Sequence, residues 1–146
     1  MAIMIRHAAF DPWQEIQQYQ NLATSGYGAT SIFIGTMRDF NQGDAVQGMT
    51  LEHYPGMTEK QLEKIVLEAQ QQWPLLDALV VHRVGDILPD EPIVLVAVWT
   101  AHRGDAFDAC RYIMEALKSK APFWKKELLK TAAERWVDAN TDGYQG

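Results

Sequence analysis

The 146-residue chain contains a single cysteine, Cys110, and no apolar run long enough to cross a membrane. One cysteine cannot form an intramolecular disulfide, which is typical of proteins in a reducing compartment. The longest apolar run, Ile93–Trp99, has the length of a strand, whereas a membrane helix needs about 20 residues. The segment Met1–Arg6 lacks the basic and then apolar layout of a secretory signal. We therefore expect a cytoplasmic protein.

The sequence also lacks the short motifs of several common enzyme classes. It contains no Walker-type loop, no three-glycine dinucleotide fingerprint and no Gly-x-Ser-x-Gly elbow. The four histidines, His7, His53, His82 and His102, do not have the spacing of metal ligands. We expect neither a metal nor another cofactor. Cys110 lies on the apolar side of a predicted helix, which favours an inert core residue over a sulfur carrier.

The net charge of −6 argues against nucleic acid or an anionic membrane as a partner. The charge is distributed unevenly, because residues 102–126 contain six lysines and arginines but only three acidic residues. A cationic island in an anionic chain can hold one small anion. A solvated helix face of lysines is the commoner role of such a run, and charge alone does not decide between the two interpretations.

The composition, with 47% hydrophobic and 22% charged residues, is that of a globular protein, and the length fits one domain over residues 1–146. Helix-start patterns, including a capping box at Thr58–Gln61, predict helices at 12–22, 58–73 and 105–118. Strands are predicted at 2–8, 31–38, 49–54, 76–84, 93–100, 123–129 and 135–137. Because helices and strands do not alternate strictly, we predict an α+β fold with a largely antiparallel sheet.

Three cationic or titratable residues lie at the ends of predicted strands. His102 and Arg103 stand where a strand runs into a helix, and the free N–H groups at a helix start suit phosphate or carboxylate. In the alternative interpretation, His102 caps the strand end and Arg103 pairs with an acid such as Asp105. Arg38 ends another strand beside a polar loop, where a ligand contact and a surface charge both fit the pattern.

Three lysines near the end of the third predicted helix are further candidates. Lys118 borders the apolar stripe of that helix. Partial burial would lower the pKa of its amine and favour a nucleophile or proton acceptor, whereas the helix C-terminus favours the charged form. Position alone favours a lysine that caps terminal carbonyls. In the strand 123–129, Lys125 and Lys126 point to opposite faces, so at most one of them shares a pocket with Phe123.

Three segments of the chain resemble the catalytic (large) subunit of molybdopterin synthase. They are Leu51–Met57 (LEHYPGM), Ala101–Arg103 (AHR) and Leu117–Glu127 (LKSKAPFWKKE). The similarity runs from about Phe33 to Val137, with the same order and similar gaps. The resemblance implies a fold of the α/β-hammerhead type and a sulfurtransferase step in molybdenum-cofactor synthesis. In that step, two dithiolene sulfurs are inserted into cyclic pyranopterin monophosphate to form molybdopterin.

The same resemblance implies the protein partners. Sulfur would arrive as a thiocarboxylate on the C-terminal Gly-Gly tail of a small ubiquitin-like subunit, the sulfur carrier. That tail would enter a pocket of the large subunit. The expected assembly is a heterotetramer built around a homodimer of large subunits. No metal is needed for this chemistry, because the sulfur nucleophile is preformed on the partner.

The resemblance also implies roles for individual residues. Lys118 would be the active-site lysine beside the thiocarboxylate, and Lys125 the second functional lysine. Arg38, His102 and Arg103 would bind the anionic end of the pterin. Neighbouring positions complete the expected substrate-binding set: Thr36, Met37, Lys126 and Glu127. Thr36 stands where a basic residue is expected from the family, and the chain reads Asp138-Ala139-Asn140 where the family often has an arginine.

Two other functions fit the residues without the resemblance. A non-catalytic regulatory domain could use Arg38, His102 and Arg103 to sense a phosphorylated metabolite, and it would not need Lys118. A pure assembly module could dock a ubiquitin-like partner. The enzyme interpretation requires that Lys118 and the arginines Arg38 and Arg103 meet in one pocket, either within one chain or across a dimer.

Overall fold

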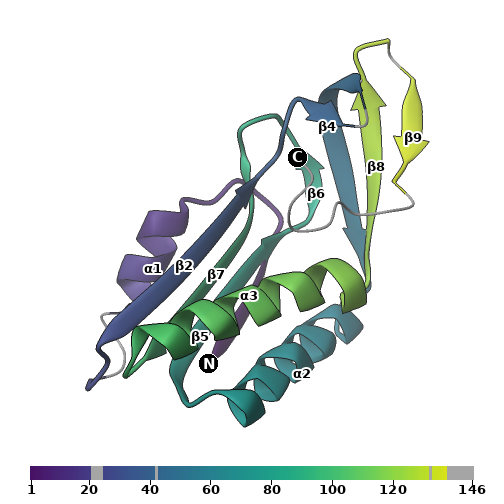
Figure 1. Cartoon of the computed structure of the whole chain (residues 1–146). Coiled ribbons are helices and arrows are strands. Elements are labelled where there is room, and N and C mark those ends of the chain that lie inside the picture. Colours follow the sequence, from purple (N-terminus) through teal and green to yellow (C-terminus); the bar gives the residue numbers. More distant parts are fainter. Residues whose placement is uncertain (21–24, 42, 132, 138–146) are drawn as a thin grey trace.

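The computed structural model describes residues 1–20, 25–41, 43–131 and 133–137, which form two sheets and three helices (Figure 1). The larger sheet has the strand order β1-β5-β7-β2. β1 runs parallel to β5, whereas the pairs β5–β7 and β7–β2 are antiparallel. These strands are β1 (Ala2–Arg6), β2 (Ala29–Thr36), β5 (Leu75–Arg83) and β7 (Pro92–Thr100).

The smaller sheet lies at one end of the molecule and is antiparallel throughout the described strands (Figure 1). Its order is β3-β4-β8-β9, and β6 pairs with β4. Its strands are β3 (Phe40–Asn41), β4 (Asp44–His53), β6 (Gly85–Ile87), β8 (Phe123–Leu129) and β9 (Glu134–Trp136). This sheet has its own small core of buried apolar side chains, which includes Val46, Leu51 and Ile87.

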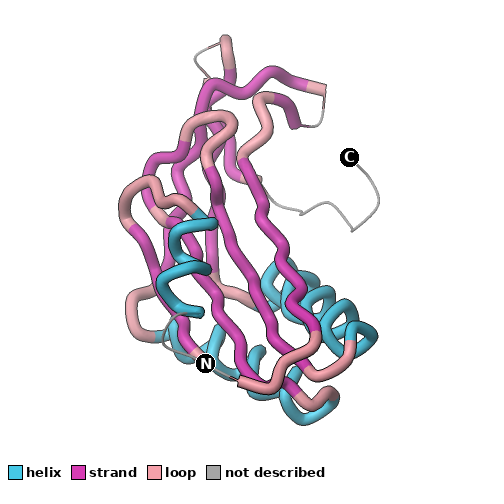
Figure 2. The backbone as a smooth tube through the Cα atoms, turned by 90° about the vertical axis from the view of Figure 1, so that its left-hand side faces the viewer, coloured by secondary structure: helices cyan, strands magenta, loops and turns pink. Residues whose placement is uncertain are grey.

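The helices α1 (Pro12–Gln20), α2 (Met57–Gln72) and α3 (Arg103–Lys120) cover both faces of the larger sheet (Figures 1 and 2). Val80 belongs to the core cluster under α2 and α3, whereas its neighbour Leu79 packs in the cluster with α1. Alternate residues of β5 and β7 are thus buried on opposite faces. This double burial explains why both strands are almost continuous apolar runs.

The prediction of an α+β fold with three helices and a largely antiparallel arrangement is confirmed for the described residues. The position of the second helix start differs from the prediction. Glu59 accepts a hydrogen bond from the Gly56 N–H at 3.0 Å, and Gly56 has a φ of 84°. Thr58 is instead buried inside the first turn, where its hydroxyl accepts from the Tyr54 N–H at 3.1 Å. The capping-box prediction at Thr58 is therefore wrong by two residues.

The smaller sheet differs from the prediction in one strand start and in two short strands, β3 and β6, that were not expected. β4 begins at Asp44 instead of Met49, because its first half pairs with β3 and β8 although it carries polar side chains. The predicted connection after β5 contains β6, which pairs with β4. Both differences come from long-range pairing, which local composition does not reveal. Within the described ranges, no helix is long and apolar enough to span a membrane.

Candidate functional site

The site is built around two lysines on either side of a short connection between α3 and β8. Lys118 lies in the last turn of α3, and Lys125 is the third residue of β8. α3 ends at Lys120 because Ala121, which precedes a proline, is extended with φ −76° and ψ 138°. The reversal of the chain after the helix brings the two lysine side chains into contact.

Lys118 perturbs the amine of Lys125 electrostatically. The pKa of Lys125 is lowered from 10.5 to about 8, first by burial and then by the positive charge of Lys118 and a hydrogen bond with that lysine. A fraction of Lys125 is therefore an uncharged amine near neutral pH. Such an amine can accept a proton, and its charged form can stabilise a developing anion.

Arg38 joins this lysine pair from a third element. It follows the end of β2, and its charge also lowers the pKa of Lys125, so the guanidinium lies within electrostatic range of that amine. Its Nη2 lies 3.4 Å from the Asn41 side-chain oxygen. The structure thus brings together three of the cationic side chains that the sequence singled out. We call Arg38, Lys118 and Lys125 the cationic cluster.

Lys126 is not part of the cationic cluster, contrary to the expected substrate-binding set. It lies on the other face of β8, where its ammonium pairs with Glu134 at 3.2 Å and lies 5.4 Å from the centre of the Trp136 ring. Phe123 and Lys125 share the inner face, as the alternation of a strand requires.

Glu127 supports the cationic cluster from the next inward position of β8. It is only 6% exposed, and its carboxylate accepts hydrogen bonds from Asn41 at 3.0 Å and from Arg135 at 2.9 Å. Its negative charge raises the pKa of Lys125 and so opposes the effect of Lys118. Because both carboxylate oxygens accept hydrogen bonds from neighbouring side chains, Glu127 serves as a counter-charge and a brace between strands, and its contact with substrate stays a prediction.

Thr36 and Met37, which precede Arg38 and were expected to bind substrate, differ in their exposure to solvent. Met37 is 4% exposed and packs in the core of the smaller sheet. Its N–H donates to the Glu91 carbonyl at 3.0 Å, and its carbonyl accepts from Asp90 at 2.8 Å. Met37 therefore fixes the start of the Arg38 segment and has no exposed group for a ligand. Thr36 is exposed at the end of β2 and remains a candidate contact.

His102 and Arg103 lie at the opposite end of α3 from Lys118. His102 is the N-cap residue and Arg103 the first helical residue, and both are exposed. Lys118 is fifteen positions after Arg103, which corresponds to about 22 Å along the helix. The expectation of a single pocket is therefore not met within one chain. Among the described residues Arg103 forms no ion pair with Asp105, and the His102 side chain makes no cap hydrogen bond.

His82 is a site residue that the sequence analysis did not identify. It lies on β5, is 8% exposed, and stacks on Phe123 with ring centres 3.9 Å apart and planes tilted by 15°. Burial lowers its pKa to about 4, and the charges of Lys125, Lys118 and His53 act in the same direction. The signal in the sequence was a titratable side chain near the end of the apolar run Leu75–Arg83.

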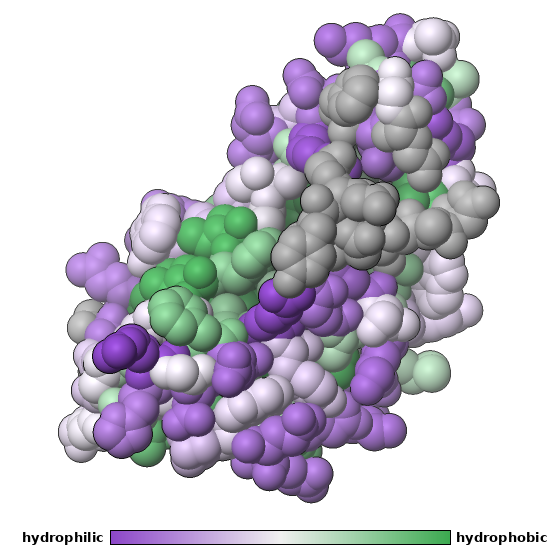
Figure 3. Space-filling model, in the orientation of Figure 1, coloured by the Kyte–Doolittle hydropathy of each residue, from purple (hydrophilic) through white to green (hydrophobic). Residues whose placement is uncertain are grey.

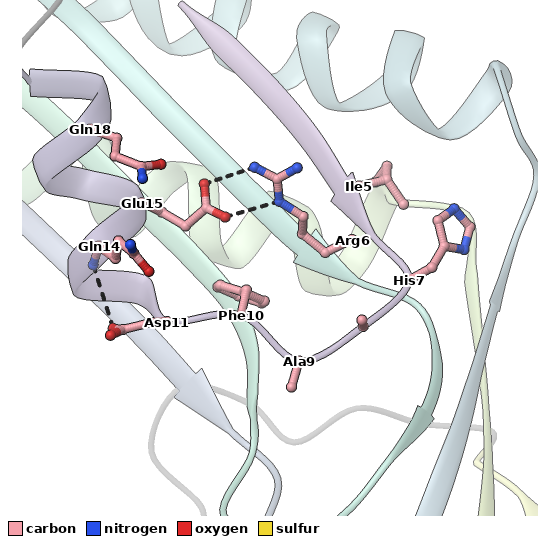
Figure 4. Close-up of a pocket in the computed structure, with 10 residues that line it drawn as sticks. Ile5, Arg6, His7, Ala9, Phe10, Asp11, Gln14, Glu15 and Gln18 are labelled. Carbon is pink, nitrogen blue, oxygen red and sulfur yellow. Dashed lines mark hydrogen bonds and ion pairs between the residues drawn. The ribbon is translucent and has the colours of Figure 1, made fainter.

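Apart from the cationic cluster, a hollow of about 510 Å³ lies between the end of β1 and α1 (Figure 4). Its arginine, Arg6, is paired with Glu15 by two hydrogen bonds of 2.9 Å. The His7 ring turns away from this hollow, and its centre lies 5.8 Å from that of His53 (Figure 4). The hollow thus contains a matched ion pair and not a group of like charges, which makes it a weaker candidate for binding an anion.

An exposed apolar patch lies over the larger sheet and α3 (Figure 3). It contains Ile32 and Phe33 from the edge strand β2 and Phe107 from α3, which is 65% exposed. These side chains line a pocket of about 290 Å³. Phe107 is one helical turn after Arg103, so the patch adjoins the His102 and Arg103 end of the helix.

Neither the cysteine nor the histidines of the described residues form a metal site. Within those ranges, no three His, Cys, Asp or Glu side chains lie close enough together to hold a metal ion. Cys110 is buried, and burial raises the pKa of its thiol. The prediction that Cys110 is a core residue is confirmed, and its raised thiol pKa disfavours the thiolate that sulfur transfer needs.

Comparison with known proteins places the chain in a family. A family model described as MoaE protein matches residues 5–120, from the end of β1 to the end of α3. The chain belongs to the MoaE family. A relative from Pseudomonas aeruginosa is 55% identical over 141 residues, covering 94% of this chain and 91% of the relative. Another, from Ralstonia nicotianae, is 55% identical over 137 residues, covering 94% and 77%. Both are named molybdopterin synthase catalytic subunit.

A solved structure supports the same MoaE assignment. The molybdopterin biosynthesis MoaE protein from Burkholderia ambifaria is 49% identical and superimposes with a TM-score of 0.81. The match covers 98% of this chain and 94% of that chain. The fold described above is therefore the MoaE fold over nearly the whole length. The cationic cluster is a feature of this chain within that fold.

The lowered pKa of Lys125 predicts a pH-dependent cost in stability. Because the pKa is about 8 in the folded chain and 10.5 in the unfolded chain, the unfolded chain binds more protons between these values. The free energy of unfolding should therefore rise as the pH increases from 8 to 10.5. Below pH 8 the charged Lys125 destabilises the folded chain by its full amount. Lys125→Met should stabilise the protein at pH 7 by on the order of 1 kcal/mol.

Urea unfolding of the wild type and Lys125→Met at pH 7, 8, 9 and 10 measures this effect. The advantage of the variant should shrink as the pH rises. Lys126→Met is the matched control, because Lys126 is adjacent in sequence but lies on the other face of β8. Equal pH dependence in the wild type and Lys125→Met would show that Lys125 is not perturbed by folding.

Proposed function

We propose that this chain is the catalytic subunit of a molybdopterin synthase, a sulfurtransferase that inserts two dithiolene sulfurs into cyclic pyranopterin monophosphate. The observation that carries the proposal is the contact between Lys118 and Lys125 beside Arg38, in a chain that belongs to the MoaE family. A regulatory domain that only senses an anion needs arginine but does not need an amine whose pKa is lowered to about 8.

The cationic cluster fits the charges of both reactants. The substrate carries a cyclic phosphate, and the sulfur donor is a thiocarboxylate at the Gly-Gly tail of a small ubiquitin-like subunit. Lys118 positions the thiocarboxylate and assists proton movement as sulfur attacks. Lys125 and Arg38 stabilise the negative charge that builds up when the cyclic phosphate opens, in a pocket partly shielded from water. The word subunit in the relatives' name implies such a partner.

His102 and Arg103 serve the cationic cluster of a second copy in the homodimer that we propose. Their distance of about 22 Å from Lys118 along α3 prevents a shared pocket within one chain. The apolar patch of Ile32, Phe33 and Phe107 adjoins these two residues and lies partly on an edge strand. Burying this patch against a second copy would stabilise a dimer and carry the helix N-terminus, with its phosphate-binding N–H groups, toward the partner.

The proposal also covers the domain organisation, the assembly and the cellular compartment of the protein. Residues 1–146 act as one unit, because the cationic cluster combines β2, α3 and β8 from both sheets. The homodimer binds two small subunits and forms a heterotetramer. The expected reaction takes place in the cytoplasm.

A reconstitution experiment tests the function. The purified chain is mixed with cyclic pyranopterin monophosphate and a small subunit that ends in a thiocarboxylate, and the dithiolene product is measured by mass spectrometry. We expect multiple turnovers with the thiocarboxylate and none with a small subunit that ends in an ordinary carboxylate. Pterin binding without turnover would select the regulatory domain, and binding of the small subunit alone would select the assembly module.

A further inference from the structure

We propose that the ion pair between Arg83 and Glu91 positions Arg38 in the cationic cluster, and that it does so through the turn Leu88–Glu91. Both members of the pair are positioning residues, because they act through the backbone of Met37. The inference deepens the proposed function and rests on it for the role of Arg38 in turnover. The geometry that carries it is a continuous path of hydrogen bonds and one ion pair from β5 to the residue before Arg38.

The turn Leu88–Glu91, which joins β6 to β7, holds the residue before Arg38 by two backbone hydrogen bonds. The Met37 N–H donates to the Glu91 carbonyl at 3.0 Å, and the Asp90 N–H donates to the Met37 carbonyl at 2.8 Å. These bonds lie just beyond the register shift near the end of β2. With both backbone polar groups of Met37 fixed, the direction in which the chain leaves the sheet toward Arg38 is also fixed.

The turn has a backbone conformation that needs support from its surroundings. The Glu91 N–H donates to the Leu88 carbonyl at 3.1 Å, with Pro89 at the second position of the turn. Asp90, at the third position, has a φ of 70°, as a type II turn requires. Residues other than glycine rarely adopt this left-handed conformation, and it persists where neighbouring contacts hold it.

The side chain of Glu91 supplies one such contact. Its Oε1 accepts a hydrogen bond from the Leu88 N–H at 2.7 Å, which closes the turn a second time. The same oxygen lies 3.1 Å from Nη1 of Arg83. The hydrogen bond from Leu88, opposed by partial burial, and then the charge of Arg83 lower the pKa of Glu91. The carboxylate is therefore charged near neutral pH.

Arg83 anchors this carboxylate to the larger sheet. It is the last residue of β5 and is 7% exposed, and its Nη2 donates to the Asp86 carbonyl at 2.6 Å. The guanidinium thus joins β5, β6 and the turn. Among the ion pairs of the described residues, Glu91 is the acid that neutralises this buried cation. Because a buried charge is costly without a counter-charge, the two groups hold each other, and the turn with them.

The competing interpretation is an ion pair that only stabilises the junction between β5 and the turn. It accounts for the burial and for the hydrogen bonds. It also predicts that activity stays intact when both charges are replaced by apolar side chains in a chain that still folds. In the positioning interpretation, the same replacement keeps the fold but loosens Arg38. Loss of stability in a single variant does not separate the two, because it leaves one buried charge unpaired.

The test is therefore the double variant Arg83→Met with Glu91→Leu, since replacing both charges of a buried pair by apolar groups tends to preserve stability. Exchange of the Met37 amide hydrogen, followed by NMR in the full chain, should become about tenfold faster because the turn opens more often. In the reconstituted reaction, kcat/KM for cyclic pyranopterin monophosphate should fall about tenfold. The KM for the small subunit should stay within about twofold, because Lys118 positions its tail.

The matched control is Arg6→Met with Glu15→Leu, the same double substitution at a neighbouring ion pair. Arg6 lies beside Arg83 in the register of β1 and β5, and its ion pair with Glu15 has a distance of 2.9 Å. This control should leave both the exchange of the Met37 amide and the turnover of the pterin at the wild-type values. Should the first double variant not fold, Glu91→Gln replaces it with the same readouts, because it removes the charge and keeps an acceptor for the Leu88 N–H.

The proposal stands if Met37 exchange and kcat/KM for the pterin both change in the folded variant, and it is overturned if either stays at the wild-type value. A third readout needs no substrate. The heteronuclear NOE of the Arg38 Nε–H, assigned with Arg38→Lys, should fall when the pair is replaced. If the wild type shows no turnover, the proposed function fails by its own experiment, and this NOE decides the positioning: a lower value supports it and an unchanged value overturns it.

Discussion

Lys118→Ala should abolish molybdopterin formation in the reconstituted reaction while the fold and the binding of the small subunit stay intact. The side chain lies in the last turn of α3 and is exposed, so its truncation should change stability by no more than about 0.5 kcal/mol. Its amine, however, contacts Lys125 in the cationic cluster. Loss of a group that stabilises charge in a reacting centre lowers turnover by at least about a hundredfold.

Lys120→Ala is the matched control for this variant. Lys120 lies two residues further along the same helix, and its ammonium is 3.6 Å from Glu68, away from the cationic cluster. Its removal should leave turnover within about twofold of the wild type, since exposed ion pairs contribute little. Product formation, thermal melting and small-subunit binding are measured on all three proteins. Turnover retained in Lys118→Ala would remove that lysine from the mechanism.

Most of the fold could be predicted from local patterns in the sequence. The runs that became β5 and β7 are apolar on both faces, and the helix that became α3 carries a clear apolar stripe and a stop before Pro122. Those signals are local, and so they survive in a single sequence. The first half of β4 and the strand β6 were missed because their partners are distant in sequence and their side chains are polar or few.

The structure brings some of the expected site residues together and separates others, for physical reasons. Arg38 and Lys125 are in the cationic cluster with Lys118, whereas Met37 is core and Lys126 faces the other side of β8. A resemblance assigns roles to short segments, but the alternation of a strand places neighbouring residues on opposite faces. His82 was missed because its importance depends on a stack with a residue 41 positions away.

Mixing two inactive variants should restore part of the activity if His102 and Arg103 act in the pocket of a second copy. Arg103→Ala and Lys118→Ala should each be inactive alone, because each removes one contribution to the pocket. If each pocket combines Lys118 of one copy with Arg103 of the other, a mixed dimer of the two variants contains one intact pocket and one doubly defective pocket. Random exchange of subunits makes half of the dimers mixed, so about a quarter of the wild-type activity should return.

The experiment mixes the two purified variants under conditions that allow subunit exchange and follows product formation with an excess of thiocarboxylated small subunit. A mixture of Lys118→Ala with Lys125→Ala is the control, because both lysines belong to the same end of one chain. Its mixed dimers have one defective lysine in each pocket, so no activity should return. Recovery in the first mixture and not in the control requires that the two ends of α3 act in different pockets. No recovery in either would mean that Arg103 does not act across the dimer, and the second-copy arrangement would then be wrong.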